Sequence, residues 1–184
     1  AWIFEAGMQV SYAELHCLSN FSFLRGASHP EELVERALAL EYTGLAITDE
    51  CSFAGSVRAH LALKEAREND ELARAFRLIH GTEIQLTEGE GKRAVPGAKL
   101  VLLAQTRAGY GNLSQLVTLG RRQAVKGSYC LSAADFEAHA EWLDDVLALL
   151  LPLRHWREPL DAARVEREAR WLAELKPGAS WIAC

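Results

Sequence analysis

The stretch Tyr12–Pro30, "YAELHCLSNFSFLRGASHP", decides how this chain is expected to fold. A short alternation of apolar and polar residues reaches His16, and a loop of small, polar and aromatic residues follows it. Ser28 is a suitable N-cap for the next helix, and Pro30 is tolerated in its first turn because the missing N–H has no intrahelical partner there. The stretch therefore predicts one βα unit, with a histidine at the end of its strand.

The rest of the chain continues the alternation of strands and helices. After the first unit, we expect strands at 45–49, 76–86, 98–106 and 145–152, helices at 54–68, 110–123, 133–139 and 161–175, a hairpin tip at 88–97, and a sixth strand that starts at 180. In the second helix, Val57 and Leu61 are expected to face inward. Repeated βα units predict an α/β fold with a mostly parallel sheet, either doubly wound or an incomplete barrel. The chain carries neither GxGxxG nor GxxxxGK[ST], which argues against the nucleotide-binding versions.

Composition and charge limit the function classes. The net charge of −5 gives the chain no general basic field, so we expect any DNA contact to be local or made elsewhere. The apolar run 146–151 is far shorter than the ~20 residues of a membrane span, which predicts a cytoplasmic protein without a membrane partner. The four cysteines have no CxxC spacing, which is typical of reduced thiols.

The ends of the first three strands carry the side chains with chemical potential. His16 follows the first strand, Asp49 and Glu50 follow the second, and Glu83 lies in the third. Carboxyl ends of parallel strands gather at one edge, where imidazole and carboxylates can bind a divalent cation. Spacing alone leaves two plainer interpretations open: the histidine is hydrogen-bonded for structure, and Asp49 caps the loop before the next helix.

Other polar residues invite structural interpretations. His80 is interpreted as a hydrogen-bonded core histidine, and His155, after the fifth strand, is a weaker site candidate. The basic cluster 119–127 ends a predicted helix, where cations are favoured by the helix dipole. A phosphate contact is the alternative for that cluster.

Four separate blocks resemble one known family. They are "AELHCLSNFSFLRGASHPEELV", "GLAITDECSFAGSVRAH", "GTEIQL" and "AQTRAGYGNLSQLVTLGRR". Together they resemble the N-terminal PHP (polymerase and histidinol phosphatase) domain of bacterial DNA polymerase III alpha subunits, and most of all its error-prone, translesion branch. The likeness is collinear over residues 11–184.

The resemblance implies a fold and a parent activity. The fold is a distorted PHP-type (β/α)7 barrel over 11–184, here expected to lack its last strands, with 1–10 as an N-terminal extension. The parent family is a DNA-directed DNA polymerase, a nucleotidyltransferase of translesion synthesis, DNA replication past damage and DNA repair. Its polymerase module, which uses Mg²⁺, lies outside this chain, so we expect this part alone to be inactive as a polymerase. The implied partners are the remainder of the polypeptide, DNA through the other modules, translesion accessory proteins and the sliding clamp.

The same resemblance implies a vestigial metal site. PHP phosphoesterases begin with His-x-His; His16 matches the first histidine and Leu18 stands in place of the second. The family's Thr-Asp-His is here Thr48-Asp49-Glu50, and Glu83 matches a glutamate ligand position. The implied ligands are His16, Asp49, Glu50 and Glu83, and the implied ions are Zn²⁺ or Mn²⁺, bound in part or not at all.

Two replacements predict that the metal chemistry is disrupted. Leu18 cannot coordinate a cation, and Arg25 stands where relatives often carry an acid before the glycine. A unit charge at 4 Å would repel another by ~4 kcal/mol at an effective dielectric of 20. Alternatively, Arg25 substitutes for the ion by pairing with Glu50 or Glu83. The leading hypothesis is a structural PHP domain; a metal-dependent phosphoesterase or 3′–5′ exonuclease and a truncated, non-functional product are the alternatives.

Overall fold

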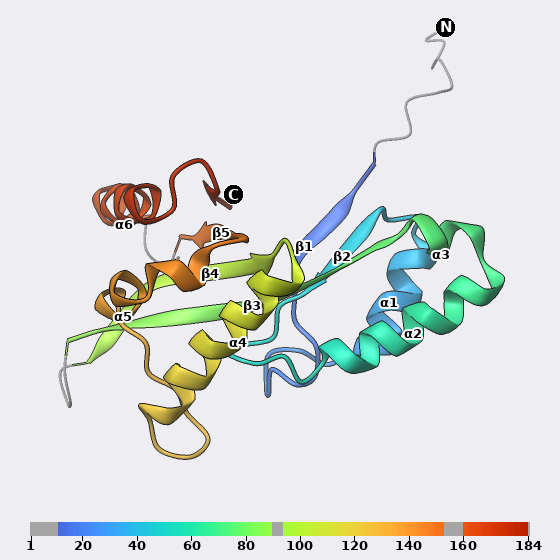
Figure 1. Cartoon of the computed structure of the whole chain (residues 1–184), viewed down its shortest axis with the longest axis horizontal. Helices are drawn as coiled ribbons and strands as arrows, with labels where there is room; N and C mark the ends of the chain where they lie inside the picture. Colours follow the sequence, from blue (N-terminus) through green and yellow to red (C-terminus); the bar gives the residue numbers. More distant parts are fainter. Residues whose placement is uncertain (1–10, 90–93, 153–159, 184) are drawn as a thin grey trace, which may run out of the picture.

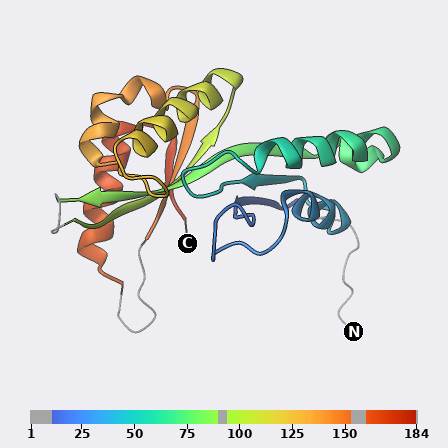
Figure 2. The same cartoon turned by 90° about the horizontal axis from the view of Figure 1, so that it is seen from below.

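The computed structural model describes residues 11–89, 94–152 and 160–183, which form one curled α/β sheet with helices packed on it (Figures 1 and 2). The six strands are ordered along the sheet as they are along the chain. They are β1 (Ala13–Cys17), β2 (Gly44–Ile47), β3 (Arg77–Glu88), β4 (Val95–Ala104), β5 (Val146–Leu151) and β6 (Ser180–Ile182). The helices are α1 (Pro30–Ala39), α2 (Ser56–Asn69), α3 (Glu71–Ala75), α4 (Arg107–Arg122), α5 (Ala133–Ala138) and α6 (Ala162–Leu175), with a 3-10 turn η2 at Ala140–Leu143.

The sheet is mixed, because β4 runs against its neighbours. The pairs β1–β2, β2–β3 and β5–β6 are parallel, whereas β3–β4 and β4–β5 are antiparallel. The expectation of a mostly parallel sheet is therefore right for three of the five pairs. The reversal follows from the short connector after β3, since a parallel return needs a crossover of a dozen or more residues. The α/β class and the open, curled sheet agree with an incomplete barrel.

Strand β3 holds the two halves of the molecule together. Its first four residues, Arg77–His80, pair with β2, and Gly81–Glu88 pair with β4. In Figure 1 the elements from β1 to α3 lie on one side and those from α4 to α6 on the other, with β3 passing through both. The chain thus needs one long strand to join two separately packed groups of helices.

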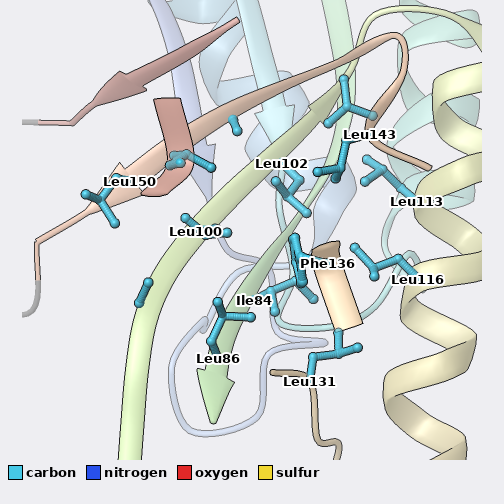
Figure 3. Close-up of a cluster of buried hydrophobic side chains, with 14 of the residues drawn as sticks. Ile84, Leu86, Leu100, Leu102, Leu113, Leu116, Leu131, Phe136, Leu143 and Leu150 are labelled. Carbon is cyan, nitrogen blue, oxygen red and sulfur yellow. The ribbon is translucent and has the colours of Figure 1, made fainter. Parts of the chain in front are cut away.

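Helices cover the sheet through two apolar clusters. One joins α1, α2 and α3 to β2, around residues such as Val34, Leu63 and Phe76. The other joins α4, α5 and α6 to β3, β4 and β5, and Figure 3 shows Phe136 between Leu102 on the sheet and Leu116 on α4. Alternate residues of β4 serve opposite faces: Leu100 and Leu102 belong to this second cluster, whereas Val101 and Leu103 form a third one.

Two local expectations need correction. The N-cap of α1 is His29 rather than Ser28, and its backbone N–H donates to the Glu32 carboxylate over 2.8 Å. In α2, Val57 and Leu61 are 64% and 56% exposed, so the prediction that they face inward is wrong. Ala59 and Leu63 face the core instead, because their side of α2 packs against α1 and β2. The segment 1–10 and residues 90–93 of the predicted hairpin tip lie outside the described residues.

Ser132 is the N-cap of α5, since its hydroxyl accepts a hydrogen bond from the backbone N–H of Asp135. Within the described ranges, no helix is long and apolar enough to cross a membrane.

Leucines 61 and 63 of α2 provide a matched pair for testing this packing. Leu63 is 2% exposed, so Leu63→Ala should lower the free energy of unfolding by about 2–4 kcal/mol through lost burial and the cavity left behind. Leu61→Ala should change it by less than about 0.5 kcal/mol, because the side chain is mostly in water. Urea unfolding followed by circular dichroism measures both. Equal losses would contradict the orientation of α2.

Candidate functional site

Asp49 organises the loop that follows β1. Its carboxylate is buried and accepts hydrogen bonds from the backbone N–H and the hydroxyl of Ser19, at 2.9 and 2.7 Å, and from the hydroxyl of Ser22 at 2.7 Å. The Ser22 hydroxyl in turn accepts from the backbone N–H of Glu50 at 3.0 Å. The loop is thereby fastened to the end of β2, and both Asp49 oxygens are engaged in it.

Two glycines allow the loop to lie this close. A Cβ at Gly26 would stand 2.0 Å from the Ser19 carbonyl oxygen, and one at Gly55 would stand 2.7 Å from Oδ2 of Asp49. Both distances are shorter than any van der Waals contact, so these positions exclude a side chain. The loop conformation in turn delivers Arg25 to the edge of the sheet.

Glu83 is the centre of the candidate site. Its side chain is 0% exposed, and each carboxylate oxygen has two partners from different elements. His16 Nε2 lies 2.8 Å from Oε2, which also accepts from Nη2 of Arg25 at 3.0 Å. Nη1 of Arg25 donates to Oε1, and the Nζ of Lys99 lies 3.1 Å from the same oxygen. Strands β1, β3 and β4 and the loop after β1 therefore converge on one buried carboxylate.

Glu50 extends the cluster toward the second half of the chain. Its Oε2 accepts from Arg25 Nη1 at 2.9 Å, and its Oε1 accepts from the Tyr129 hydroxyl at 2.9 Å. The Tyr129 oxygen also accepts the backbone N–H of Gln85 at 2.9 Å. Arg121, from the predicted basic cluster, donates to the carbonyl oxygens of Glu50 and Cys51, so its role here is structural.

The charges of the cluster stabilise its ionised form. Burial alone raises the pKa of Glu83, but hydrogen bonds from His16 and Arg25 and the charge of Lys99 outweigh it and hold that pKa well below its usual range. The hydrogen bond to Glu83 likewise raises the pKa of Arg25. Burial raises the pKa of Tyr129, so its phenol stays protonated and donates to Glu50. Glu50 and Glu83 thus share the positive charge of Arg25, and Glu83 also contacts Lys99.

This donor set does not fit a metal ion. Within the described ranges, no group of three or more His, Cys, Asp or Glu side chains is arranged to hold one. His16, Glu50 and Glu83 do come together, but Arg25 lies between the two glutamates and Lys99 holds a further position on Glu83. Leu18 offers no ligand atom, and the Asp49 oxygens are bound within the loop. An ion would have to displace two positive charges.

Several residues of the cluster were not predicted from the sequence. Lys99 had a signal: a lysine inside the apolar strand "AKLVLLA", on the face shared with Val101, which pairs directly with Glu83. Tyr129 had none, because it lies in an irregular segment far along the chain. His80 was interpreted as satisfied, but its Nδ1 is buried without a hydrogen-bond partner among the described residues. His155 lies outside them.

A curled α/β sheet whose strand ends gather histidine and carboxylates is the architecture of a PHP domain, and the PHP domain model matches residues 14–170. The chain belongs to the PHP family. It is 51% identical to an error-prone DNA polymerase from Bordetella bronchiseptica over 93% of this chain, and 49% identical to one from Azoarcus over 94%. The chain spans only 15% and 16% of the length of these two relatives.

Solved structures agree on the fold. One from Bifidobacterium adolescentis, described as a metal-dependent phosphoesterase, superposes with a TM-score of 0.55 at 16% identity and covers 94% of this chain and 77% of its own. An amidohydrolase from Chromobacterium violaceum gives 0.52 at 17% identity, with 94% and 76% covered. At such identities the likeness shows the fold alone.

The lowered pKa of Glu83 predicts a specific acid sensitivity. Its folded-state pKa lies below the ordinary 4.5, so the stability that its ionised form contributes is present above pH 4.5 and is lost as the pH falls below it. Glu83→Gln should therefore destabilise the chain most at pH 6–7, and the difference from the unmodified chain should shrink below about pH 4.5. Urea unfolding at a series of pH values measures this. A difference that stays constant down to pH 3 would contradict the assignment.

Proposed function

We propose that this chain is the PHP portion of a bacterial error-prone DNA polymerase, which acts in DNA replication past damage and in DNA repair, and that it serves there as a structural module. The identity of about half of the residues to such polymerases supports the first part. The contact of Arg25 and Lys99 with the buried Glu83 carboxylate carries the second. The vestigial site consists of His16, Asp49, Glu50 and Glu83, with Leu18 and Arg25 as the disrupting residues.

The physical basis is that the cluster already contains its counter-charge. A buried carboxylate is unfavourable unless it is paired and hydrogen-bonded, and Glu83 has both kinds of partner from this chain itself. The guanidinium of Arg25 joins Glu50 to Glu83, as a bridging cation would. Arg25 thus keeps the strand ends together without an ion, and it leaves no open position for a metal-bound nucleophile.

The remaining activities of the polymerase belong to other modules. Nucleotide transfer with Mg²⁺ and most DNA contacts are assigned to polypeptide outside this chain, as are binding to the sliding clamp and to translesion accessory proteins. The net charge of −5 supports this division, because it gives the PHP portion no general attraction for DNA. The cytoplasm of a bacterium is the proposed location.

Metal analysis tests the structural role directly. After dialysis against Mn²⁺ or Zn²⁺ and removal of free ions, the chain should retain no stoichiometric metal and should not hydrolyse a phosphodiester. The variant Leu18→His/Arg25→Asp/Glu50→His should gain bound metal, because it adds ligands at positions 18 and 25, replaces a carboxylate by an imidazole at position 50, and removes one of the two competing cations. Mass spectrometry of the metals and a chromogenic phosphodiester measure both properties. Two or three ions with metal-dependent turnover in the unmodified chain would favour the phosphoesterase or 3′–5′ exonuclease instead.

The bridging role of Arg25 makes a separate stability prediction. Arg25→Met should lower the free energy of unfolding by about 3 kcal/mol, since it leaves a buried carboxylate short of a partner; the side chain's one-third exposure places the value at the low end of the usual range. Arg58→Met is the matched control, because it removes an exposed ion pair with Glu31 and should change stability by less than about 1 kcal/mol. Thermal and urea unfolding compare the two. Similar losses would contradict a special role for Arg25.

A further inference from the structure

A groove of about 830 Å³ lies where β3 and β4 separate. The first residues of β3, Arg77–His80, pair with β2 on one side, and β4 joins β3 only from Gly81 onward. Helix α2 runs along this part of β3 (Figure 2), and both α2 and the first turn of α4 contribute to the walls of the groove. Nothing in the Glu83 cluster lines it, so the groove is separate from the candidate site.

The walls are apolar and open to water. Val57, Leu78, Ile79, Leu103 and Tyr110 are among the lining residues. Val57 is 64% exposed, and Leu61 follows it by one helical turn at 56%. The opposite face of α2 already packs against α1 and β2, so these two side chains form a second apolar face that nothing in the described residues covers.

The charged residues that line the groove are basic. They are Arg77 and Arg107, and the described lining residues include no aspartate or glutamate. This is unlike the chain as a whole, which is acidic. His80 also lines the groove, and its buried Nδ1 has no partner among the described residues. The groove therefore suits an apolar segment that carries an acidic side chain.

We infer that this groove binds an apolar, acidic segment from the rest of the polymerase polypeptide, an inference that rests on the proposed function. About five sixths of each relative's length lies outside the part that this chain matches, so such a polypeptide is tethered to the domain in those proteins. Tethering raises the effective concentration of a docking segment, so even a modest groove becomes occupied. The exposed face of α2 then becomes an interface inside one protein.

The test uses a full-length polypeptide: the Bordetella bronchiseptica relative with its matching segment replaced by this chain. A photo-crosslinking phenylalanine analogue is placed at Val57, and the control analogue at Val125, which is 80% exposed and lies away from the groove. Mass spectrometry should find position 57 joined to an apolar segment with an acidic residue beyond the grafted part, and position 125 joined to none. A position 57 that stays unlinked, or links only within the graft or to a second copy, would overturn the inference.

A charge at the same position gives an independent measurement. Val57→Asp should lower the melting temperature of the full-length chimera, whereas Val125→Asp should not. Neither substitution should change the melting temperature of the separate 184-residue chain, because both valines are exposed. Equal melting of both chimeras would count against the groove. The metal content of the same chimera tests the proposed function separately. A metal-free chimera without a crosslink would contradict only the inference that the groove binds a segment. A metal-loaded chimera with the crosslink would contradict only the proposed structural role.

Discussion

The buried carboxylate of Glu83 is the interaction on which the rest of the structure depends. An unpaired charge in a protein interior is strongly unfavourable, so this side chain can exist only where several cations or donors reach it. Here they come from three places in the chain: His16 on β1, Arg25 in the following loop, and Lys99 on β4. The pairing of β1, β3 and β4 in one sheet therefore brings together the side chains that neutralise Glu83.

The loop after β1 explains how Arg25 arrives there. Asp49 collects hydrogen bonds from Ser19 and Ser22, and Gly26 permits the chain to pass against the Ser19 carbonyl oxygen. Asp49 thus contributes to the cluster indirectly, because it holds the loop that carries the Arg25 guanidinium. A PHP-like arrangement of strand ends is retained, while the cations that hold it together come from side chains of the protein itself.

The long strand β3 also leaves an apolar surface of the molecule uncovered. One end belongs to the packing of α1 and α2 and the other to that of α4, α5 and α6, and the two packings do not meet along its first residues. The groove beside Val57 is the result. The Glu83 cluster and the apolar groove thus lie on neighbouring parts of the same strand. The charges of the cluster are paired within this chain, whereas the groove is open to a partner.

Local patterns predicted most elements, since strand alternation, helix caps and glycine positions act over a few residues. They predicted the strand that carries His16, the helix that begins at Ala133 and the strand that carries Glu83. They failed for Val57 and Leu61, because periodicity reveals an apolar face but not whether the chain itself supplies the surface that covers it. The hairpin predicted at 88–97 agrees with the antiparallel pairing of β3 and β4, whereas the repeated βα pattern alone had suggested a mostly parallel sheet.

By itself, the sequence determined the family, the α/β class and the identity of the altered residues Leu18, Arg25 and Glu50. Motifs and hydrophobic patterns along the chain are sufficient for these conclusions, because they involve residues close together in sequence. Only the tertiary structure decided what the alterations do. Lys99 and Tyr129 are distant along the chain from the residues they contact, and no local pattern encodes that they meet Glu83 and Glu50. Arg25 alone could have repelled an ion or paired with either glutamate. It lies against both because the loop held by Asp49 places it there.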